Sequence, residues 1–177
     1  GIMMEDLCYP IGRFNFKDEV TAEQRLIFID EIAETPRRLR LAVAGLSEEQ
    51  LDTPYRPQGW TVRQVVHHLP DSHLNAYMRF KLALTEDEPV IKTFLEGSWA
   101  ELEDARAAPI EISLSLLEAL HMRWVMLLRS LGEADFARTF RHPEWGIVSL
   151  DKHLALYAWH GRHHIAQITS LRQRMGW

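Results

Sequence analysis

The sequence lacks several features that would assign it to common classes of protein. It has one cysteine, Cys8, in 177 residues, so no disulfide can form within the chain and its stability must come from packing or from a metal. Acidic residues outnumber basic ones, the formal net charge is -5, and no basic tract occurs, which argues against a nucleic-acid-binding protein. No stretch approaches the roughly 20 apolar residues that span a membrane.

An apolar signal segment is also missing from the N-terminus, because Glu5 and Asp6 follow after only a few positions. With its single cysteine, the chain is therefore expected to be a soluble cytoplasmic protein. Gly1 precedes two methionines and is interpreted as a remnant of cloning. At this length and 46% hydrophobic content we expect one domain, residues 21–177, preceded by an extended N-terminal arm at residues 1–20.

Four amphipathic segments predict four long helices. Thr21 and Thr61 each lie three residues before a glutamine, which is the spacing of a capping box, and apolar residues follow at helical intervals. The expected helices are residues 21–45, 61–85, 115–132 and 149–175. We therefore predict an all-α four-helix bundle, with a long crossover connection at residues 86–110 and an irregular segment or short hairpin at residues 133–149.

Two prolines fall inside the expected helices. Pro36 is expected to kink the first helix or to mark a local break, and Pro70 removes a hydrogen bond from the second and bends it. The bend leaves the phase of the neighbouring histidines open. On an ideal helical wheel His73 lies centrally on the apolar face, His68 lies at its edge and His67 lies on the far side.

His160 and His164 lie one turn apart, so a helix places both on one face. His164 falls in the middle of the apolar stripe of that helix and His160 at its edge, whereas His163 points further away. Two buried imidazoles need partners for their ring nitrogens, and a shared metal ion and a hydrogen-bonded core pair explain the spacing equally well. No glutamate follows His160, so this is not the zincin pattern, which carries its general base on the helix.

A second histidine-rich stretch, residues 60–73, is the expected source of a third ligand. Three histidines that leave one coordination position open are typical of catalytic rather than structural zinc. The geometry alone nominates His73 or His68, and His67 is expected at the surface. His121 is a further candidate, although its position is more typical of a packed core histidine.

Several motifs resemble the YfiT branch of the DinB-like family, and the similarity covers nearly the whole chain. They are residues 9–12 (YPIG), 52–56 (DTPYR), 59–69 (GWTVRQVVHHL), 71–73 (DSH), 159–160 (WH), 163–166 (HHIA) and 174–177 (RMGW). The resemblance implies a DinB-type four-helix bundle, commonly a homodimer, that binds one zinc or nickel ion per chain through three histidines. The first ligand of the family directly precedes a leucine and is here His68, and the other two match His160 and His164. Relatives have alanine where this chain has Pro70.

With His68 as the ligand, Asp71 and His73 become residues that could orient a ligand ring. The resemblance implies a metal-dependent hydrolase in which water on the ion attacks a small substrate. Related members of the superfamily resemble transferases that use a low-molecular-weight thiol such as bacillithiol, so thiol S-transfer is the alternative. A third reading is a binding protein without catalytic activity that the metal stabilises. The sequence identifies neither a general base nor a substrate.

Overall fold

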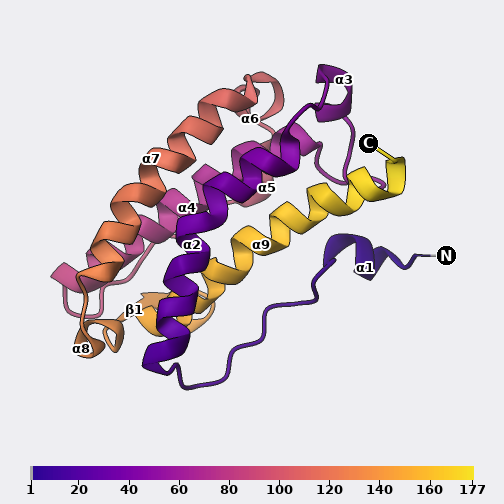
Figure 1. The fold of residues 1–177 in the computed structure, drawn as a ribbon. Coiled ribbons are helices and arrows are strands. Elements are labelled where there is room, and N and C mark those ends of the chain that lie inside the picture. The colour runs from indigo at the N-terminus through magenta and orange to yellow at the C-terminus, as the bar shows by residue number, and fades with distance from the viewer. Residues whose placement is uncertain (1) are drawn as a thin grey trace.

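The fold is that of a computed structural model, which describes residues 2–177. Gly1, interpreted above as a remnant of cloning, lies outside the described residues. The long helices of the bundle are α2 (Ala22–Val43), α4 (Val62–Thr85), α7 (Ile110–Arg129) and α9 (Leu150–Met175) (Figure 1). They confirm the predicted all-α four-helix bundle.

The starts of α2, α4 and α9 lie where the sequence predicts them, because each is fixed by a local cap. The hydroxyl groups of Thr21 and Thr61 accept a hydrogen bond from the backbone N–H of the glutamine three residues on, and the glutamine side chain accepts one in return. Ser149 accepts from the N–H of Lys152, and Gly176 ends α9 in the left-handed region at φ 70°. These contacts require no tertiary structure.

The predicted start of the third helix was wrong. It begins at Ile110, directly after Pro109, rather than near residue 115. A proline suits this place because the first residues of a helix need no N–H donor. Ser115, where the helix was expected to begin, lies inside it, and its hydroxyl donates to a carboxylate oxygen of Glu111 at 3.2 Å.

Neither proline interrupts its helix. Pro36 lies within α2 and Pro70 within α4, and both helices continue past them, so the predicted local break at Pro36 is absent. A proline has no N–H to donate, so the carbonyl four residues earlier is left without its helical partner. For Pro36 that carbonyl belongs to Ile32, and the interior of the bundle uses it, as described below.

Short elements connect the long helices. The first is α1 (Met4–Cys8), so the arm, expected to be extended, begins with a helix. The others are α3 (Glu48–Leu51), α5 (Glu96–Ala100), α6 (Glu103–Ala107), α8 (Glu133–Phe136), β1 (Thr139–His142) and β2 (Gly146–Ser149). The two strands pair antiparallel, with Thr139 opposite Ser149, and confirm the predicted hairpin. No helix within residues 2–177 is long and apolar enough to cross a membrane.

Buried histidines lie between two apolar clusters of the interior. One cluster includes Phe80, Trp124 and Leu154, and the other includes Val66 and Ile168. Along both α4 and α9 the chain passes from one cluster to the other through a turn that carries buried imidazole rings. The polar groups there must find partners inside the protein, because an unsatisfied buried group destabilises the fold.

Candidate metal centre

Three histidine side chains meet between α4 and α9. His68 comes from α4, and His160 and His164 come from consecutive turns of α9. Each offers one ring nitrogen to a cluster in which these atoms all lie within 4.8 Å of one another. Nε2 of His68 is 3.4 Å from Nε2 of His160. Two nitrogens bound at about 2.05 Å to a tetrahedral ion lie about 3.4 Å apart, so this spacing fits a shared metal ion.

The protein interior keeps these rings neutral. Burial lowers the pKa of His68 to about 4, and it lowers the pKa values of His160 and His164 well below the ordinary range. Repulsion between the neighbouring rings acts in the same direction. A neutral imidazole has the free lone pair that a metal ion requires, so no proton has to leave these rings near pH 7 before an ion binds.

His160 also belongs to a line of hydrogen-bonded rings, here named the histidine chain. Its Nδ1 is 3.1 Å from Nε2 of His73, and Nδ1 of His73 is 2.8 Å from Nε2 of His121. The line ends where Nδ1 of His121 meets the carbonyl oxygen of Ile32 at 2.6 Å. That carbonyl is available because Pro36 supplies no N–H to it.

The carbonyl sets the direction of every hydrogen bond in the histidine chain. It can only accept, so Nδ1 of His121 carries hydrogen and Nε2 of this neutral ring accepts from His73. The same argument applied to His73 makes its Nε2 the acceptor from Nδ1–H of His160. The lone pair of His160 therefore lies on Nε2, the atom that faces His68.

Gln167 orients the third ring in the same way. The amide nitrogen of Gln167 donates to the carbonyl oxygen of Cys8 at 2.9 Å, so the amide oxygen faces Nδ1 of His164 at 2.8 Å. Nδ1 of His164 then carries the hydrogen, and Nε2 is left free. Both α9 histidines thus present Nε2, which is the usual result of an outer hydrogen bond to a metal-binding histidine.

The sequence model of the DinB superfamily matches residues 31–168. The chain belongs to the DinB superfamily. A Bacillus cereus relative is 55% identical over 174 residues, covering 98% of this chain and all of the relative, and an Oceanobacillus iheyensis relative is 57% identical over 169 residues, covering 96% and 98%. Both are provisionally named metal-dependent hydrolases.

Solved structures share the four-helix bundle fold of this chain. YfiT from Bacillus subtilis is described as a probable metal-dependent hydrolase with an unusual four-helix bundle topology. It matches with a TM-score of 0.95 and 50% identity, covering 97% of this chain and 99% of that one. The four-helix bundle protein TT2238 matches at a TM-score of 0.56 and 17% identity, covering 80% of this chain and 94% of that one, so it supports the fold alone. The resemblance to the YfiT branch is confirmed.

Two histidines of this DinB bundle lie where the wheel did not place them. His67, expected at the surface, is buried, with its nitrogens 2.6 Å from the hydroxyl of Ser113 and 2.8 Å from the carbonyl oxygen of Ala108. His163, expected to point away, is buried between the rings of Tyr9 and Trp159. His73 is buried, as its central position on the wheel predicts, but it is a link in the histidine chain and lies outside the cluster of three ring nitrogens.

Asp71 differs from its expected role of orienting a ligand ring. Within residues 2–177, its carboxylate makes no hydrogen bond to any histidine ring. The rings of His160 and His164 are instead hydrogen-bonded to His73 and Gln167. Burial, and secondarily the charge of Asp104, raise the pKa of Asp71 to about 6. The sequence alone does not reveal the role of Gln167, because the partner of its amide group is the remote residue Cys8.

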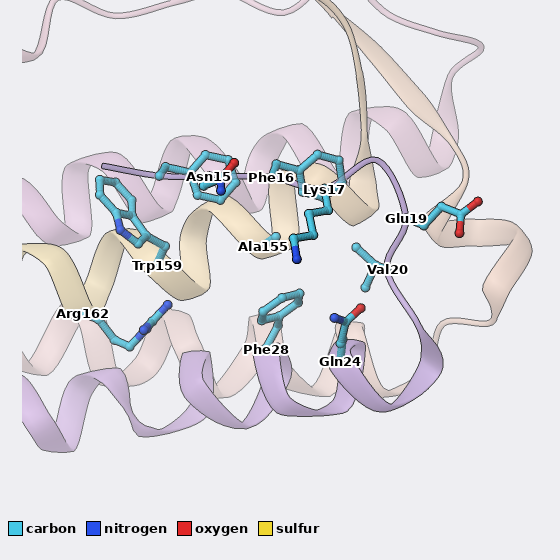
Figure 2. A pocket seen from close by; sticks show the side chains of 11 residues that line it. Asn15, Phe16, Lys17, Glu19, Val20, Gln24, Phe28, Ala155, Trp159 and Arg162 are labelled. Carbon is cyan, nitrogen blue, oxygen red and sulfur yellow. The ribbon is translucent and has the colours of Figure 1, made fainter. Parts of the chain in front are cut away.

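Two cavities lie beneath the N-terminal arm, and one of them reaches the cluster. Figure 2 shows side chains of the arm, α2 and α9 that line one of them, among them Phe16, Phe28 and Trp159. This cavity has a volume of about 240 Å³, and none of the three clustered histidines lines it. The other, of about 350 Å³, is here named the arm cavity. It is lined by Cys8, Tyr9, Tyr55, Arg56, Gln58, Gly59, Trp60, His163, His164 and Gln167. Because His164 lines it, the arm cavity borders the cluster on one side.

Aromatic contacts hold the arm in place over α9. The ring of Tyr9 stacks on His163 at 5.4 Å between centroids, and Phe14 lies 5.8 Å from Trp159. Gln167 adds the hydrogen bond to the carbonyl of Cys8. The arm, which follows α9 in Figure 1, is therefore a wall of the cavity that leads to the histidines.

Proposed function

We propose that this chain is a metal-dependent hydrolase that holds one divalent ion, zinc or nickel, through Nε2 of His68, His160 and His164. The observation that carries the proposal is the convergence of three neutral rings, two of which are turned inward by the hydrogen bonds that they donate to His73 and Gln167. The provisional names of relatives at 55% identity over the full chain support the same activity.

The three rings bring no negative charge to the ion. Such an ion supplies a Lewis acid that acidifies water toward a pKa of about 7 and polarises a substrate carbonyl. The protein's own part is to hold His160 and His164 in one tautomer, to exclude bulk water from the cluster and to admit substrate beside His164.

The lining of the arm cavity favours one alternative, the transfer of a thiol to an electrophile. No carboxylate occurs among the described residues that line it, so the cavity offers no general base of the zincin type. A thiol loses its proton more readily than water does and needs less help from a base. Thiol transfer is therefore the second candidate function.

One experiment separates these functions. The full chain is purified without an affinity-metal step, stripped with a chelator and reloaded with zinc or nickel. It is then assayed with nitrophenyl esters, and in parallel with a thiol and an alkyl halide. We expect ester hydrolysis that depends on the ion and is lost in His160→Gln. Consumption of thiol without hydrolysis would establish the transferase instead. If the metal-loaded chain catalyses neither reaction, the result would favour the third possibility, a metal-stabilised binding protein without catalytic activity.

The histidine chain predicts an effect at a distance from the ligands. Replacing His121 with leucine removes the acceptor of the His73 hydrogen bond and frees the tautomer of His160. We expect metal binding to weaken about 10- to 100-fold, which is typical when a ligand loses its outer hydrogen-bond partner. Competition between the protein and a chelating dye measures this change in Kd.

A second substitution at the same position separates orientation from packing. Glutamine has both a donor and an acceptor, so His121→Gln can donate to Ile32 and accept from His73. We expect its affinity to lie within about threefold of the parent, well short of the loss in the leucine variant. Equal losses in both variants would show that the ring at this position acts only through packing.

A further inference from the structure

Arg56 is the positive charge of the arm cavity. Among the described residues that line the cavity, Arg56 is the one arginine or lysine, and no aspartate or glutamate lines it. Its guanidinium donates to the hydroxyl of Tyr55 at 3.1 Å and to the carbonyl of Pro57 at 2.9 Å.

No carboxylate within residues 2–177 forms an ion pair with this guanidinium, whereas Arg25, Arg40 and Arg63 all have acidic partners. In a chain of net charge -5, a positive charge without such a partner creates a local field that attracts anions. The cavity is therefore electrostatically unlike the molecule as a whole.

The loop that carries Arg56 is shaped to hold it at the cavity. The N–H of Tyr55 donates to the carbonyl of Trp60, and the N–H of Gly59 donates to the carbonyl of Arg56, both at 2.9 Å. A Cβ at Gly59 would lie 2.6 Å from Cγ of Arg56, so only glycine allows the arginine to lie over the turn. Gln58 adopts the left-handed region at φ 62°, a conformation that costs energy outside glycine and is common at binding sites.

We propose that Arg56 binds an anionic group, a carboxylate or a phosphate, of a small substrate that occupies the arm cavity and places its reacting group beside His164. This inference rests on the proposed function and defines the class of its substrate. A guanidinium matches the two oxygens of such a group with parallel hydrogen bonds. The cavity of about 350 Å³ has the size of a small-molecule site, and the rings of Tyr9 and Trp60 provide apolar walls.

Cys8 provides a reporter for this charge, because it is the one cysteine of the chain and lines the same cavity. Its thiolate displaces iodide from iodoacetate, an anion, or from iodoacetamide, a neutral molecule, and forms an S–C bond in either case. Mass spectrometry of the full chain gives both second-order rate constants. Their ratio cancels the thiolate fraction, which is common to both reactions, so it reports the attraction of the anion alone.

Arg56→Gln is expected to lower the iodoacetate-to-iodoacetamide ratio about threefold to tenfold, the effect of one unit charge a few ångströms away in a partly solvated cavity. Arg123→Gln changes the net charge equally on the exposed surface of α7 and should leave the ratio unchanged. Arg56→Lys keeps the charge and should retain most of the preference. The proposal would be overturned if Arg56→Gln lowered the ratio by less than threefold, or if Arg123→Gln or Arg56→Lys lowered it as much as Arg56→Gln does.

Two anions then define the chemistry of the ligand. Succinate and inorganic phosphate are tested for slowing the alkylation of Cys8 by iodoacetamide, with neutral succinamide as the control. Protection by succinate identifies a carboxylate substrate and protection by phosphate a phosphorylated one, whereas protection by neither overturns the substrate class. Alkylation needs no metal ion, so the proposed function is judged separately. If the metal-loaded chain hydrolyses no ester but the iodoacetate-to-iodoacetamide ratio depends on Arg56, only the proposed hydrolase activity is excluded. If hydrolysis depends on the metal but the ratio does not depend on Arg56, only the proposed anion site is excluded.

Discussion

Replacing His160 with glutamine is expected to weaken the binding of zinc or nickel by about a thousandfold or more. The substitution removes one of three ligands, and each ligand of a zinc site contributes a large share of a binding free energy of about 10–16 kcal/mol. It also separates the cluster from His73, since Nδ1 of His160 donates the hydrogen bond to His73. Elemental analysis of the purified chain and competition with a chelating dye give the stoichiometry and the Kd.

His163→Gln is the matched control for this measurement. It makes the same substitution on the same helix, but the ring of His163 stacks between Tyr9 and Trp159 and lies outside the cluster. Its affinity should stay within about threefold of the parent, because its side chain contributes no ligand. An equal loss in both variants would attribute the effect to general damage of α9, and an unchanged Kd in His160→Gln would exclude this histidine as a ligand.

Acid is expected to unfold the metal-free chain between about pH 6 and pH 5. Burial lowers the pKa values of His68, His121 and His163 to about 4 and those of several other histidines well below the ordinary range. The histidines whose pKa values lie well below the ordinary range are His73, His153, His160 and His164. In the unfolded chain each ring returns to a pKa of about 6.5.

The sign of this effect follows from proton binding. Above pH 6.5 the rings are neutral in both states, and the free energy of unfolding has its full value. As the pH falls from about 6.5 towards 4, the unfolded chain takes up protons that the folded chain rejects, so stability falls by up to about 1.4 kcal/mol per pH unit for each ring. Several rings together therefore match a typical folding stability of about 5–15 kcal/mol within one to two pH units.

Urea unfolding at pH 7.5, 6.5 and 5.5 measures the effect as a falling midpoint. His153 offers a specific control, since both of its ring nitrogens are buried without a hydrogen-bond partner among the described residues, and Phe80, Phe140 and Tyr157 surround it. His153→Phe should reduce the pH dependence by about one ring. Added zinc should move the transition to lower pH, because it binds the folded chain. A midpoint that does not change with pH would contradict the buried neutral rings.

The sequence predicted those parts of the fold that local contacts determine. The capping boxes at Thr21 and Thr61 placed two helices correctly because every atom of the cap lies within one turn. The same reasoning misplaced the start of α7. The spacing of Ser115 and Glu118 imitates a capping box, while the proline that actually precedes the helix leaves a weaker signal.

In the candidate site, too, the sequence predicted the features that local spacing determines and missed those that depend on remote contacts. The spacing of His160 and His164 is local and was read directly, whereas the choice of His68 depended on the family resemblance. His121 and Gln167 gain their roles from partners far away in the sequence, such as Ile32 and Cys8, so no pattern of spacing could reveal them. The burial of His67 has the same cause, because its partners Ala108 and Ser113 lie 41 and 46 residues further along the chain.

Each long helix of the bundle supplies one member of the histidine chain. The carbonyl of Ile32 comes from α2, His73 from α4, His121 from α7 and His160 from α9. The tautomer of His160 is therefore set only when all four helices are packed together. If any one of them is out of place, the ring can carry its hydrogen on either nitrogen. Metal uptake would then follow the docking of all four helices, so the ion would distinguish finished molecules from intermediates instead of nucleating the fold.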